Sequence, residues 1–485
     1  MTDRPLWTVE AMAAAMGATP AGPQPLSIPG ISIDTRTVAP GEAFFAIKGD
    51  NRDGHEFVEA ALAAGAGIAV VASDRRGRFP DHAPLLVVPD VLDGLRELAR
   101  AARARTRAKI IAVTGSVGKT STKEALRLTL VPDGETHASI ASYNNHWGVP
   151  LSLARCPDTA RYAVFEIGMN HAGEIEPLTR LVRPQVAIIT TVEPVHLEFF
   201  RSVEAIADAK AEIFLGLEPG GAAVINRDNP QFARLERGAQ NARVARIVSF
   251  GEHARADARL IRCALQSEGS TVEAQIFGTN VTYKLGAPGR HLVLNSLAVL
   301  AATVLVGADL ALAALALARL QPASGRGTRC ILETAGGTAL LIDESYNANP
   351  ASMRAALGLL GHSDVGPRGR RIAILGDMLE LGPQGRDLHR ELAESVLANG
   401  VDLVFCCGPL MRGLWEALPP GRQGGYAETS TALEPQVLAA IQTGDAVMVK
   451  GSLGSRMAPI VKALQNRYRR VAPATTRAPL STMNG

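Results

Sequence analysis

The sequence predicts an α/β protein of three domains, in which a small N-terminal α/β domain and a C-terminal Rossmann-like α/β domain flank a central parallel-sheet domain. Short apolar runs rich in β-branched residues alternate with segments of helical spacing along most of the chain. A basic run at 103–109 and a Pro/Gly-rich run at 321–327 interrupt this alternation, and 485 residues suffice for about three domains. We therefore expect domains at 1–107, 108–322 and 323–470, followed by a disordered tail at 471–485.

Composition excludes several classes of function. A net charge of +3 on this length argues against nucleic acid or a membrane surface as the main partner. Five cysteines without a CxxC pair favour reduced thiols in the cytoplasm over disulfides or a zinc site. The most apolar region, 292–320, contains Asn295 and Asp309, so it predicts buried helix and no membrane span. The N-terminus predicts a short helix capped by Thr8, not a signal peptide.

In the first domain, polar groups follow two predicted strands. Strands are expected at 31–36 and 43–49, followed by a helix at 56–64 and two further strands at 67–72 and 85–88. Arg36 and Lys48 end the first two strands and are candidates for binding a diphosphate. Charges at strand ends are more often simply solvated, so this signal alone is weak.

The most informative stretch is KIIAVTGSVGKTSTKE at 109–124, a buried strand, a glycine loop and the start of a helix. Gly115 and Gly118 lack a Cβ, so the loop can wrap an anion with its N–H groups pointing inward. Lys119 would reach the outer phosphates of a nucleotide, and the Thr120 hydroxyl would hold Mg²⁺. The alternative is a glycine-rich strand-to-helix turn that binds no phosphate. Val113 replaces a glycine of the general pattern, which points away from kinases and GTPases and toward a subset of ATP-using enzymes.

Further polar groups follow the other predicted strands of the central sheet. Glu166 ends the strand 162–167, and His196 follows the strand 185–191. Parallel sheets bind ligands at the carboxyl ends of their strands, so both side chains could complete metal coordination beside Thr120. The alternative for Glu166 is an ordinary charge at a strand end. Strands are also expected at 109–114 and 222–226.

Only eight of the 50 basic residues in this chain are lysines. Each lysine is therefore a candidate for a role that needs a compact ammonium or a reactive amine, which arginine cannot supply. Lys210 falls on the apolar stripe of a predicted amphipathic helix at 202–217, where a bare ammonium would be costly to bury. It either extends past the edge of the helix to water, is covalently modified, or lies beside phosphates. Lys48 and Lys450 precede glycines in predicted turns, whereas four other lysines are expected at the surface: Lys109, Lys123, Lys284 and Lys462.

Two loops and the last domain complete the candidate site. Asn144 and Asn145 in SYNNHWGVP, and His171 in GMNHAGEI, lie in loops expected to face substrate. The last domain predicts strands with polar ends at 339–343, 371–375, 403–406 and 446–449. Its first strand ends at Asp343, and Asn349 is expected to cap the following helix, with Pro350 in the first turn.

Taken together, these motifs resemble the Mur ligase family over nearly the whole chain except the tail. The resemblance rests on DTR at 34–36 with FFAIKG, TGSVGKT, YNNHWGVPLSL, EIGMNHAGEI, HLEFF with AKAEIF, GRHLVLN and DESYNANPASM. The SYNANP and NHAGEI runs are similar to those of the members that add a dipeptide, D-alanyl-D-alanine, to UDP-N-acetylmuramoyl-tripeptide. The resemblance implies an ATP-dependent amide ligase of peptidoglycan synthesis, cytoplasmic and monomeric, with no nucleic-acid partner and no membrane insertion.

The resemblance also implies roles for individual residues. ATP would bind on 114–120, that is Thr114, Gly115, Ser116, Val117, Gly118, Lys119 and Thr120, with contacts from Asn295, Arg326 and Asp343. Thr120 and Glu166 would coordinate one Mg²⁺, and His196 with Lys210 the other, Lys210 being carbamylated in this family. The UDP end of the precursor would bind Asp34, Thr35, Arg36, Lys48 and Gly49, and the dipeptide would bind near Tyr346, Asn347 and Asn349. The implied catalytic residues are Lys119, Lys210, His196 and Glu166.

Three other interpretations remain open at this point. The nearest is a related ligase adding a single amino acid, such as a third-residue Mur ligase or a folylpolyglutamate synthetase. The second is a P-loop ATPase that acts as a switch or motor, which would hydrolyse nucleotide without an acceptor amine. The third is a binding module that retains the fold without turnover, although the complete set of candidate catalytic residues argues against it.

Overall fold

The computed structural model describes residues 4–49, 52–140, 142–195 and 197–471, and its central sheet has nine strands. Their order is β16-β15-β14-β13-β12-β11-β8-β10-β9, parallel from β9 to β14 and antiparallel from β14 to β16. The predicted α/β class and the four predicted central strands are confirmed, whereas the antiparallel extension was not predicted. The strands are β8 (Lys109–Thr114), β9 (Thr136–Ala138), β10 (Tyr162–Glu166), β11 (Val186–Ile189), β12 (Ala222–Asn226), β13 (Arg246–Gly251), β14 (Ala258–Leu265), β15 (Ser270–Ile276) and β16 (Thr279–Leu285).

Helices cover both faces of this sheet because successive side chains of a strand point to opposite sides. Ile111 and Val113 of β8 pack against α4 (Lys119–Leu130), α9 (Arg290–Leu305) and α10 (Leu310–Ala316). Ile110 and Ala112 pack in the opposite layer with α5 (Gly148–Ala154), α6 (Ile175–Val182), α7 (Val203–Ala211) and α8 (Phe232–Asn241). Strand β8 is thus buried in the middle of the sheet, and the loop that follows it lies at the sheet's carboxyl edge.

The helices of the central unit test two expectations about burial, one for the apolar region at 292–320 and one for Lys123. The apolar region at 292–320 forms buried helices, as predicted, and Asn295 lies within α9. Among the described residues, no helix combines the length and apolar character that crossing a membrane requires. Lys123, expected at the surface, is instead fully buried in α4, because it lies on the same stripe as Leu126 and Leu130.

Strand β9 also carries a half-buried histidine, His137, whose protonation should affect stability. The Nε2 of His137 lies 2.8 Å from the carbonyl oxygen of Ser152, and desolvation by burial lowers the His137 pKa from 6.5 to about 4. Because protonation is harder in the folded state, the contribution of His137 to the free energy of unfolding should be highest above pH 6.5, fall as the pH drops from 6.5 to about 4, and level off below that. Urea unfolding at a series of pH values measures this.

The matched variant is His137→Gln, which keeps an N–H donor for Ser152 but does not titrate. It should lose the part of the pH dependence that His137 contributes. An NMR titration of wild type that gives an ordinary histidine pKa, or an unchanged pH profile in His137→Gln, would count against this explanation.

The N-terminal unit is a five-stranded sheet with the order β2-β7-β6-β5-β4. Thr8 caps α1 as predicted, since its Oγ1 accepts a hydrogen bond from the Ala11 N–H at 3.2 Å. The predicted strands at 31–36 and 43–49 are shorter than expected. The elements are β1 (Trp7–Thr8), α1 (Val9–Met16), β2 (Thr19–Ala21), β3 (Ser27–Ile28), β4 (Ile31–Ser32), β5 (Ala43–Phe45), α2 (Val58–Ala63), β6 (Ile68–Ala72), β7 (Leu85–Val88) and α3 (Val91–Arg105).

The junction between this unit and the central sheet is helical for half of its length. Arg103 and Arg105 belong to α3 and not to an irregular linker. The Arg103 side chain donates hydrogen bonds to the carbonyl oxygens of Val182 and Arg183, at 2.8 and 2.9 Å. Arg103 therefore serves as a packing contact between the two units.

The C-terminal unit is a seven-stranded sheet with the order β21-β20-β19-β22-β18-β17-β23. Asn349 caps α11 in a reciprocal capping box with Ser352, as predicted, and Pro350 occupies the first turn. The elements are β17 (Thr328–Thr334), β18 (Gly337–Glu344), α11 (Pro350–Gly361), β19 (Arg371–Gly376), α12 (Gly385–Arg390), α13 (Leu392–Ala398), β20 (Leu403–Cys407), α14 (Arg412–Ala417), β21 (Gln423–Ala427), α15 (Ser430–Ala440), β22 (Ala446–Lys450), α16 (Ala458–Arg467) and β23 (Arg470–Val471).

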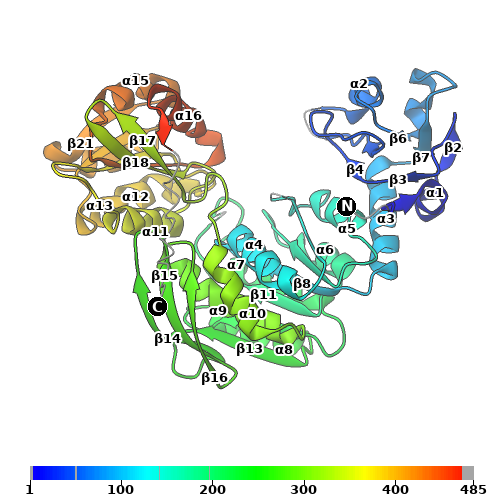
Figure 1. The fold of residues 1–485 in the computed structure, drawn as a ribbon, viewed down its shortest axis with the longest axis horizontal. Helices are drawn as coiled ribbons and strands as arrows, with labels where there is room; N and C mark the ends of the chain where they lie inside the picture. Colours follow the sequence, from blue (N-terminus) through cyan, green and yellow to red (C-terminus); the bar gives the residue numbers. More distant parts are fainter. Residues whose placement is uncertain (1–3, 50–51, 141, 196, 472–485) are drawn as a thin grey trace, which may run out of the picture.

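The two outer units lie on opposite sides of the central one (Figure 1). Residues 321–327, which contain no helix or strand, connect the central unit to the C-terminal unit. The C-terminal unit also contacts the loop after β11, where the Glu198 N–H donates to the Glu380 carbonyl oxygen at 3.3 Å. The carboxyl edge of the central sheet therefore meets the C-terminal unit beside this short connection.

Candidate active site between the central and C-terminal units

The loop between β8 and α4 has the tight backbone that the sequence predicts. Gly115 has a φ of +149°, and a Cβ there would lie 1.9 Å from the Thr190 Oγ1. Gly118 has a φ of +87°, and a Cβ there would lie 2.5 Å from the Asn295 Nδ2. A side chain at either position would force the Thr190 or Asn295 side chain to move, and positive φ favours glycine at Gly118. The loop is therefore a closed turn at the N-terminus of α4, where N–H groups and the helix dipole favour an anion.

Side chains after β11 hold this loop in place. The Thr190 hydroxyl donates to the Val117 carbonyl oxygen at 2.6 Å. Ser116 is paired twice with Glu193: its Oγ accepts from the Glu193 N–H at 3.0 Å and donates to the Glu193 carbonyl oxygen at 3.2 Å. The glycine loop and the loop after β11 are thus joined by hydrogen bonds, so we expect a displacement of one loop to displace the other.

Replacing Thr190 by valine tests this anchor, because valine keeps the shape and removes the hydroxyl. The variant leaves the Val117 carbonyl without its partner, so we expect nucleotide affinity to fall about tenfold, equivalent to about 1.4 kcal/mol. Isothermal titration calorimetry with ATP measures it. Thr282→Val, at an exposed position of β16, is the matched control. Equal affinities in the two variants would show that the hydroxyl does not anchor the loop.

Behind the loop, a threonine, a glutamate and an asparagine form one hydrogen-bonded group. The Thr120 Oγ1 donates to the Glu166 Oε2 at 2.9 Å, and the Asn144 Nδ2 donates to the Glu166 Oε1 at 2.7 Å. The Thr120 Oγ1 also lies 3.3 Å from the Ser142 Oγ. Glu166 is buried at the end of β10, so a carboxylate and two hydroxyls face the phosphate loop from behind.

Lys119 supplies the positive charge of the loop. Its Nζ donates to the Gly115 carbonyl oxygen at 2.8 Å. Burial lowers the pKa of Lys119, the negative charge of Glu166 opposes this shift, and the positive charge of Arg326 adds to it. The proximity of Lys119 and Arg326 brings two cations from different units to one place, which is what binding a polyphosphate requires.

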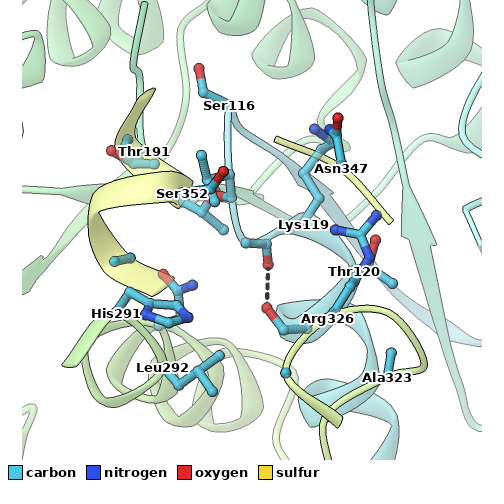
Figure 2. A pocket seen from close by; sticks show the side chains of 18 of the residues that line it. Ser116, Lys119, Thr120, Thr191, His291, Leu292, Ala323, Arg326, Asn347 and Ser352 are labelled. Atoms are coloured by element: carbon cyan, nitrogen blue, oxygen red, sulfur yellow. Dashed lines mark hydrogen bonds between the residues drawn. The ribbon is translucent and has the colours of Figure 1, made fainter. Parts of the chain in front are cut away.

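These groups open into a cavity of about 630 Å³ between the central and C-terminal units. Figure 2 shows Lys119, Arg326 and Asn347 on one side of this cavity, with His291 and Leu292 on the other. The predicted site residues that line it are Ser116, Val117, Gly118, Lys119, Thr120, Asn144, Glu166, Asn295, Arg326, Tyr346, Asn347 and Asn349. The structure therefore gathers predicted residues from six separate stretches of the sequence.

The C-terminal wall of the cavity carries its own charges. The Arg326 guanidinium lies 4.3 Å from the centre of the Tyr346 ring, in cation–π geometry. The Lys450 Nζ donates to the Glu344 Oε2 at 3.2 Å and to the Asn347 carbonyl oxygen at 2.9 Å. Lys450 is the last residue of β22 and is buried, so it is a structural cation of this wall.

Asp343 lies at a different cavity. Its Oδ1 accepts from the Ser345 N–H and hydroxyl, at 3.1 and 2.6 Å, and it lines a separate space of about 400 Å³. The reason is the alternation of side chains along β18, which turns Glu344 toward the main cavity and Asp343 away from it. A nucleotide contact from Asp343 stays a prediction.

Lys210 is buried in α7, on the apolar stripe where the sequence places it. Desolvation lowers the Lys210 pKa well below its ordinary value, and the positive charge of Lys119 lowers it further. Burial and the charge of Lys119 therefore both favour the neutral amine of Lys210 over its ammonium. Its predicted partner in a second metal site, His196, lies outside the described residues.

The donor set suits Mg²⁺ at the first site. Mg²⁺ prefers oxygen ligands and takes few of them from protein when phosphates supply the rest. Thr120 and Glu166 present such oxygens at the rim of a phosphate loop. Within the described residues, no cluster of three or more His, Cys, Asp and Glu side chains offers an all-protein metal site.

The residues predicted to bind the UDP end lie on the N-terminal sheet. Asp34 and Arg36 follow β4 and form an ion pair at 2.6 Å, which lowers the pKa of the Asp34 carboxyl. Lys48 follows β5, and its backbone pairs with that of Asp53 in an isolated antiparallel β-bridge. Thr35 adjoins the ion pair and Gly49 follows Lys48. The two turns follow neighbouring strands of one sheet edge, because β4 and β5 are parallel.

Two predicted substrate residues have other partners. The Asn145 Oδ1 accepts from the Gly148 N–H at 2.9 Å at the start of α5. The His171 ring packs on Phe199 at 4.6 Å, and its Nδ1 lies 3.0 Å from the Glu174 Oε1. His171 is exposed and joins the loop after β10 to the loop after β11. Contact of either residue with substrate stays a prediction.

Several lining residues were not singled out in the sequence, among them Thr190, His291, Glu344 and Ser352. Glu344 and Thr190 stand at strand ends, so a search of every carboxyl end would have found them. His291 lies one helical turn before Asn295 on α9, and the i, i+4 spacing was the available signal.

Comparison with known proteins agrees with this architecture. The chain matches family models described as Mur ligase family, catalytic domain (27–103), Mur ligase middle domain (113–303) and Mur ligase, glutamate ligase domain (329–453). It is 33% identical to the UDP-N-acetylmuramoyl-tripeptide–D-alanyl-D-alanine ligase of Rickettsia prowazekii, covering 90% of this chain and 95% of the relative. The same-named protein of Escherichia coli is 34% identical, over 91% and 94% of the two chains.

Solved structures give the same result. MurF from Acinetobacter baumannii superposes with a TM-score of 0.81 at 29% identity, covering 95% of this chain and 99% of that one. MurF ligase from Thermotoga maritima, solved in complex with ADP, superposes with a TM-score of 0.73 at 26% identity over 90% and 97%. These matches confirm the resemblance found in the sequence motifs, and the chain belongs to the Mur ligase family.

Proposed function

We propose that this protein joins D-alanyl-D-alanine to UDP-N-acetylmuramoyl-tripeptide in an ATP-dependent reaction of peptidoglycan synthesis. One observation carries the proposal: a single cavity brings the phosphate loop and Glu166 of the central unit against the Tyr346–Asn349 segment of the C-terminal unit. A ligase that couples ATP cleavage to amide formation needs its nucleotide and its acceptor amine in one space. The two relatives named above, over nine-tenths of this chain, support this choice of substrates.

In this proposal the phosphate loop binds the triphosphate of ATP. The N–H groups of the loop and the N-terminus of α4 hold the phosphate oxygens, and Lys119 leaves the Gly115 carbonyl to contact them. Arg326 adds a second cation from the connecting segment, and Asn295 lies against Gly118 at the same end of α9. Their charges offset the repulsion between the γ-phosphate and an incoming carboxylate.

Thr120 and Glu166 are the proposed protein ligands of one Mg²⁺, with Asn144 and Ser142 orienting them. Bound there, the ion would withdraw charge from the phosphate oxygens. Asn144 holds the Glu166 carboxylate by its Oε1, and the Glu166 Oε2 lies beside the Thr120 hydroxyl, from which it accepts a hydrogen bond.

Lys210 is proposed to act as a carbamate. A neutral amine adds to carbon dioxide, forming an N–C bond and releasing one proton to solvent, and the product carries one negative charge. Burial and the neighbouring Lys119 already favour the neutral amine, which supports this step. The anionic group would bind a second Mg²⁺ with His196, and it resolves the cost of an unpaired buried cation.

The chemistry follows from these parts. The terminal carboxylate of the tripeptide attacks the γ-phosphorus, and an acyl phosphate and ADP form. The amine of D-alanyl-D-alanine then attacks the activated carbonyl carbon, and phosphate leaves. Water must be excluded because an acyl phosphate hydrolyses readily, and closure of the C-terminal unit about 321–327 supplies this exclusion.

The three units take separate tasks in this proposal. The N-terminal unit, 1–107, holds the UDP end through Asp34, Arg36 and the Lys48–Gly49 turn. The central unit, 108–322, holds ATP, and the C-terminal unit, 323–470, presents the dipeptide near Tyr346, Asn347 and Asn349. We further propose that the protein is monomeric and cytoplasmic, which its free cysteines and its nucleotide-linked substrate support.

The acceptor distinguishes this reaction from that of the relatives that add one amino acid. Purified protein with ATP, Mg²⁺ and UDP-N-acetylmuramoyl-tripeptide should give a pentapeptide product, identified by mass, when D-alanyl-D-alanine is added. Diaminopimelate or glutamate should give no product at the same concentration. Product with a single amino acid and none with the dipeptide would overturn the assignment of acceptor and leave the ligase chemistry standing.

A further inference from the structure

Lys123 is a fully buried lysine that the proposed reaction does not use. It lies in α4, one turn after Thr120, with none of its side chain exposed. Its Nζ donates to the Ser139 carbonyl oxygen at 2.6 Å and forms an ion pair with the Glu124 Oε1 at 3.0 Å. A buried charge is costly, so its partners identify what the charge holds in place.

Ser139 follows β9, where the chain turns over the end of β10. Its N–H donates to the Val164 carbonyl oxygen at 3.2 Å, and its hydroxyl accepts from the Glu166 N–H at 3.4 Å. Ser139 is therefore hydrogen-bonded to two elements: to α4 through Lys123, and to β10 through Val164 and Glu166. Ser139 is itself buried, so the attachment is shielded from water.

The turn leads to the two side chains that contact the proposed magnesium ligands. Ser142 lies 3.3 Å from the Thr120 hydroxyl, and Asn144 donates to Glu166 at 2.7 Å. The Asn144 carbonyl oxygen also accepts from the Gly168 N–H at 2.8 Å. The hydrogen-bonded link from Lys123 to Glu166 passes through Ser139, whose carbonyl oxygen accepts from the Lys123 ammonium and whose hydroxyl accepts from the Glu166 N–H.

We propose that Lys123 is a positioning residue for the divalent-cation site, acting through Ser139 on Glu166, whose carboxylate Thr120 and Asn144 also contact. Thr120 and Lys123 lie one helical turn apart on α4, so this helix positions both the Thr120 hydroxyl and the Lys123 ammonium that binds Ser139. This inference rests on the proposed function, because it requires that Thr120 and Glu166 bind the cation of a nucleotide complex.

Lys123→Met is the principal test, because methionine has similar length and no charge. We expect ATP binding in the presence of Mg²⁺ to weaken about 10- to 100-fold, with binding in the presence of EDTA changed by less than about twofold. Both affinities are measured by titration calorimetry on the full chain. Lys284→Met, exposed on β16, is the matched control and should retain both affinities.

A purely structural role for Lys123 predicts a different pattern, in which both affinities fall together or only the melting temperature changes. Either result would overturn the inference. If Lys123→Met does not fold, Ser139→Ala replaces it, since it removes the hydroxyl that accepts from Glu166 while leaving the bond from Lys123. A loss confined to the Mg²⁺ condition supports the inference, and an unchanged Mg²⁺ dependence overturns it.

The same experiment separates this inference from the proposed function. Wild-type protein whose ATP affinity does not respond to Mg²⁺ would contradict the proposed cation site itself. Wild-type protein that responds, together with a Lys123→Met variant that responds equally, would contradict only the role of Lys123.

Discussion

Lys119→Met should reduce ligation roughly 10²- to 10³-fold in kcat, the range found when one charge-stabilising donor is removed from an active site. The methionine side chain fills the space of the lysine but places no charge beside the γ-phosphate, where negative charge accumulates as the carboxylate attacks. Steady-state phosphate release with all three substrates measures the loss.

Lys109→Met is the matched control for this variant. Lys109 is exposed at the start of β8, the same strand that leads into the phosphate loop. It should retain the activity of wild type. A Lys119→Met variant with kcat within a few-fold of the control would remove the phosphate-binding role from Lys119.

Lys210→Ala should lose ligation by at least about 10²-fold, and a short-chain carboxylate such as formate or acetate should restore part of it. The added anion enters the space left by the lysine and supplies the charge that the carbamate would supply. Ligation at increasing carboxylate concentration measures the rescue, and the melting temperature of the variant verifies that it is folded.

Two controls sharpen this result. Lys284→Ala should be unaffected by the added anion, and chloride at equal ionic strength should not rescue Lys210→Ala. Full activity in Lys210→Ala, or a folded and inactive variant that no carboxylate rescues, would contradict the carbamate role.

The sequence predicted the centre of the molecule well because the signals there are local. Strands β8, β10, β11 and β12 are continuous apolar runs, as expected of strands covered on both faces. The antiparallel strands β14 to β16 escaped prediction because polar residues interrupt their apolar pattern. Several positions of β14 and β16 are exposed, and every second position of β15 is half-buried.

The site was predictable where a motif fixes both residue and backbone, as at Gly115 to Thr120. The site residues were harder to predict where a shift of one position along a strand decides which way a side chain points. Asp343 and Glu344 are adjacent carboxylates at the end of β18, yet only Glu344 faces the main cavity. A lysine is seldom fully buried, so the sequence predicts a surface position for Lys123, although its spacing to Leu126 and Leu130 places it on the buried stripe.

Phosphate release from ATP, measured with purified protein, Mg²⁺ and UDP-N-acetylmuramoyl-tripeptide in the presence and absence of D-alanyl-D-alanine, tests the central claim most directly. We expect release to depend on the dipeptide and to match the pentapeptide formed mole for mole. Release at the same rate without tripeptide and dipeptide would contradict the ligase assignment and identify an ATPase.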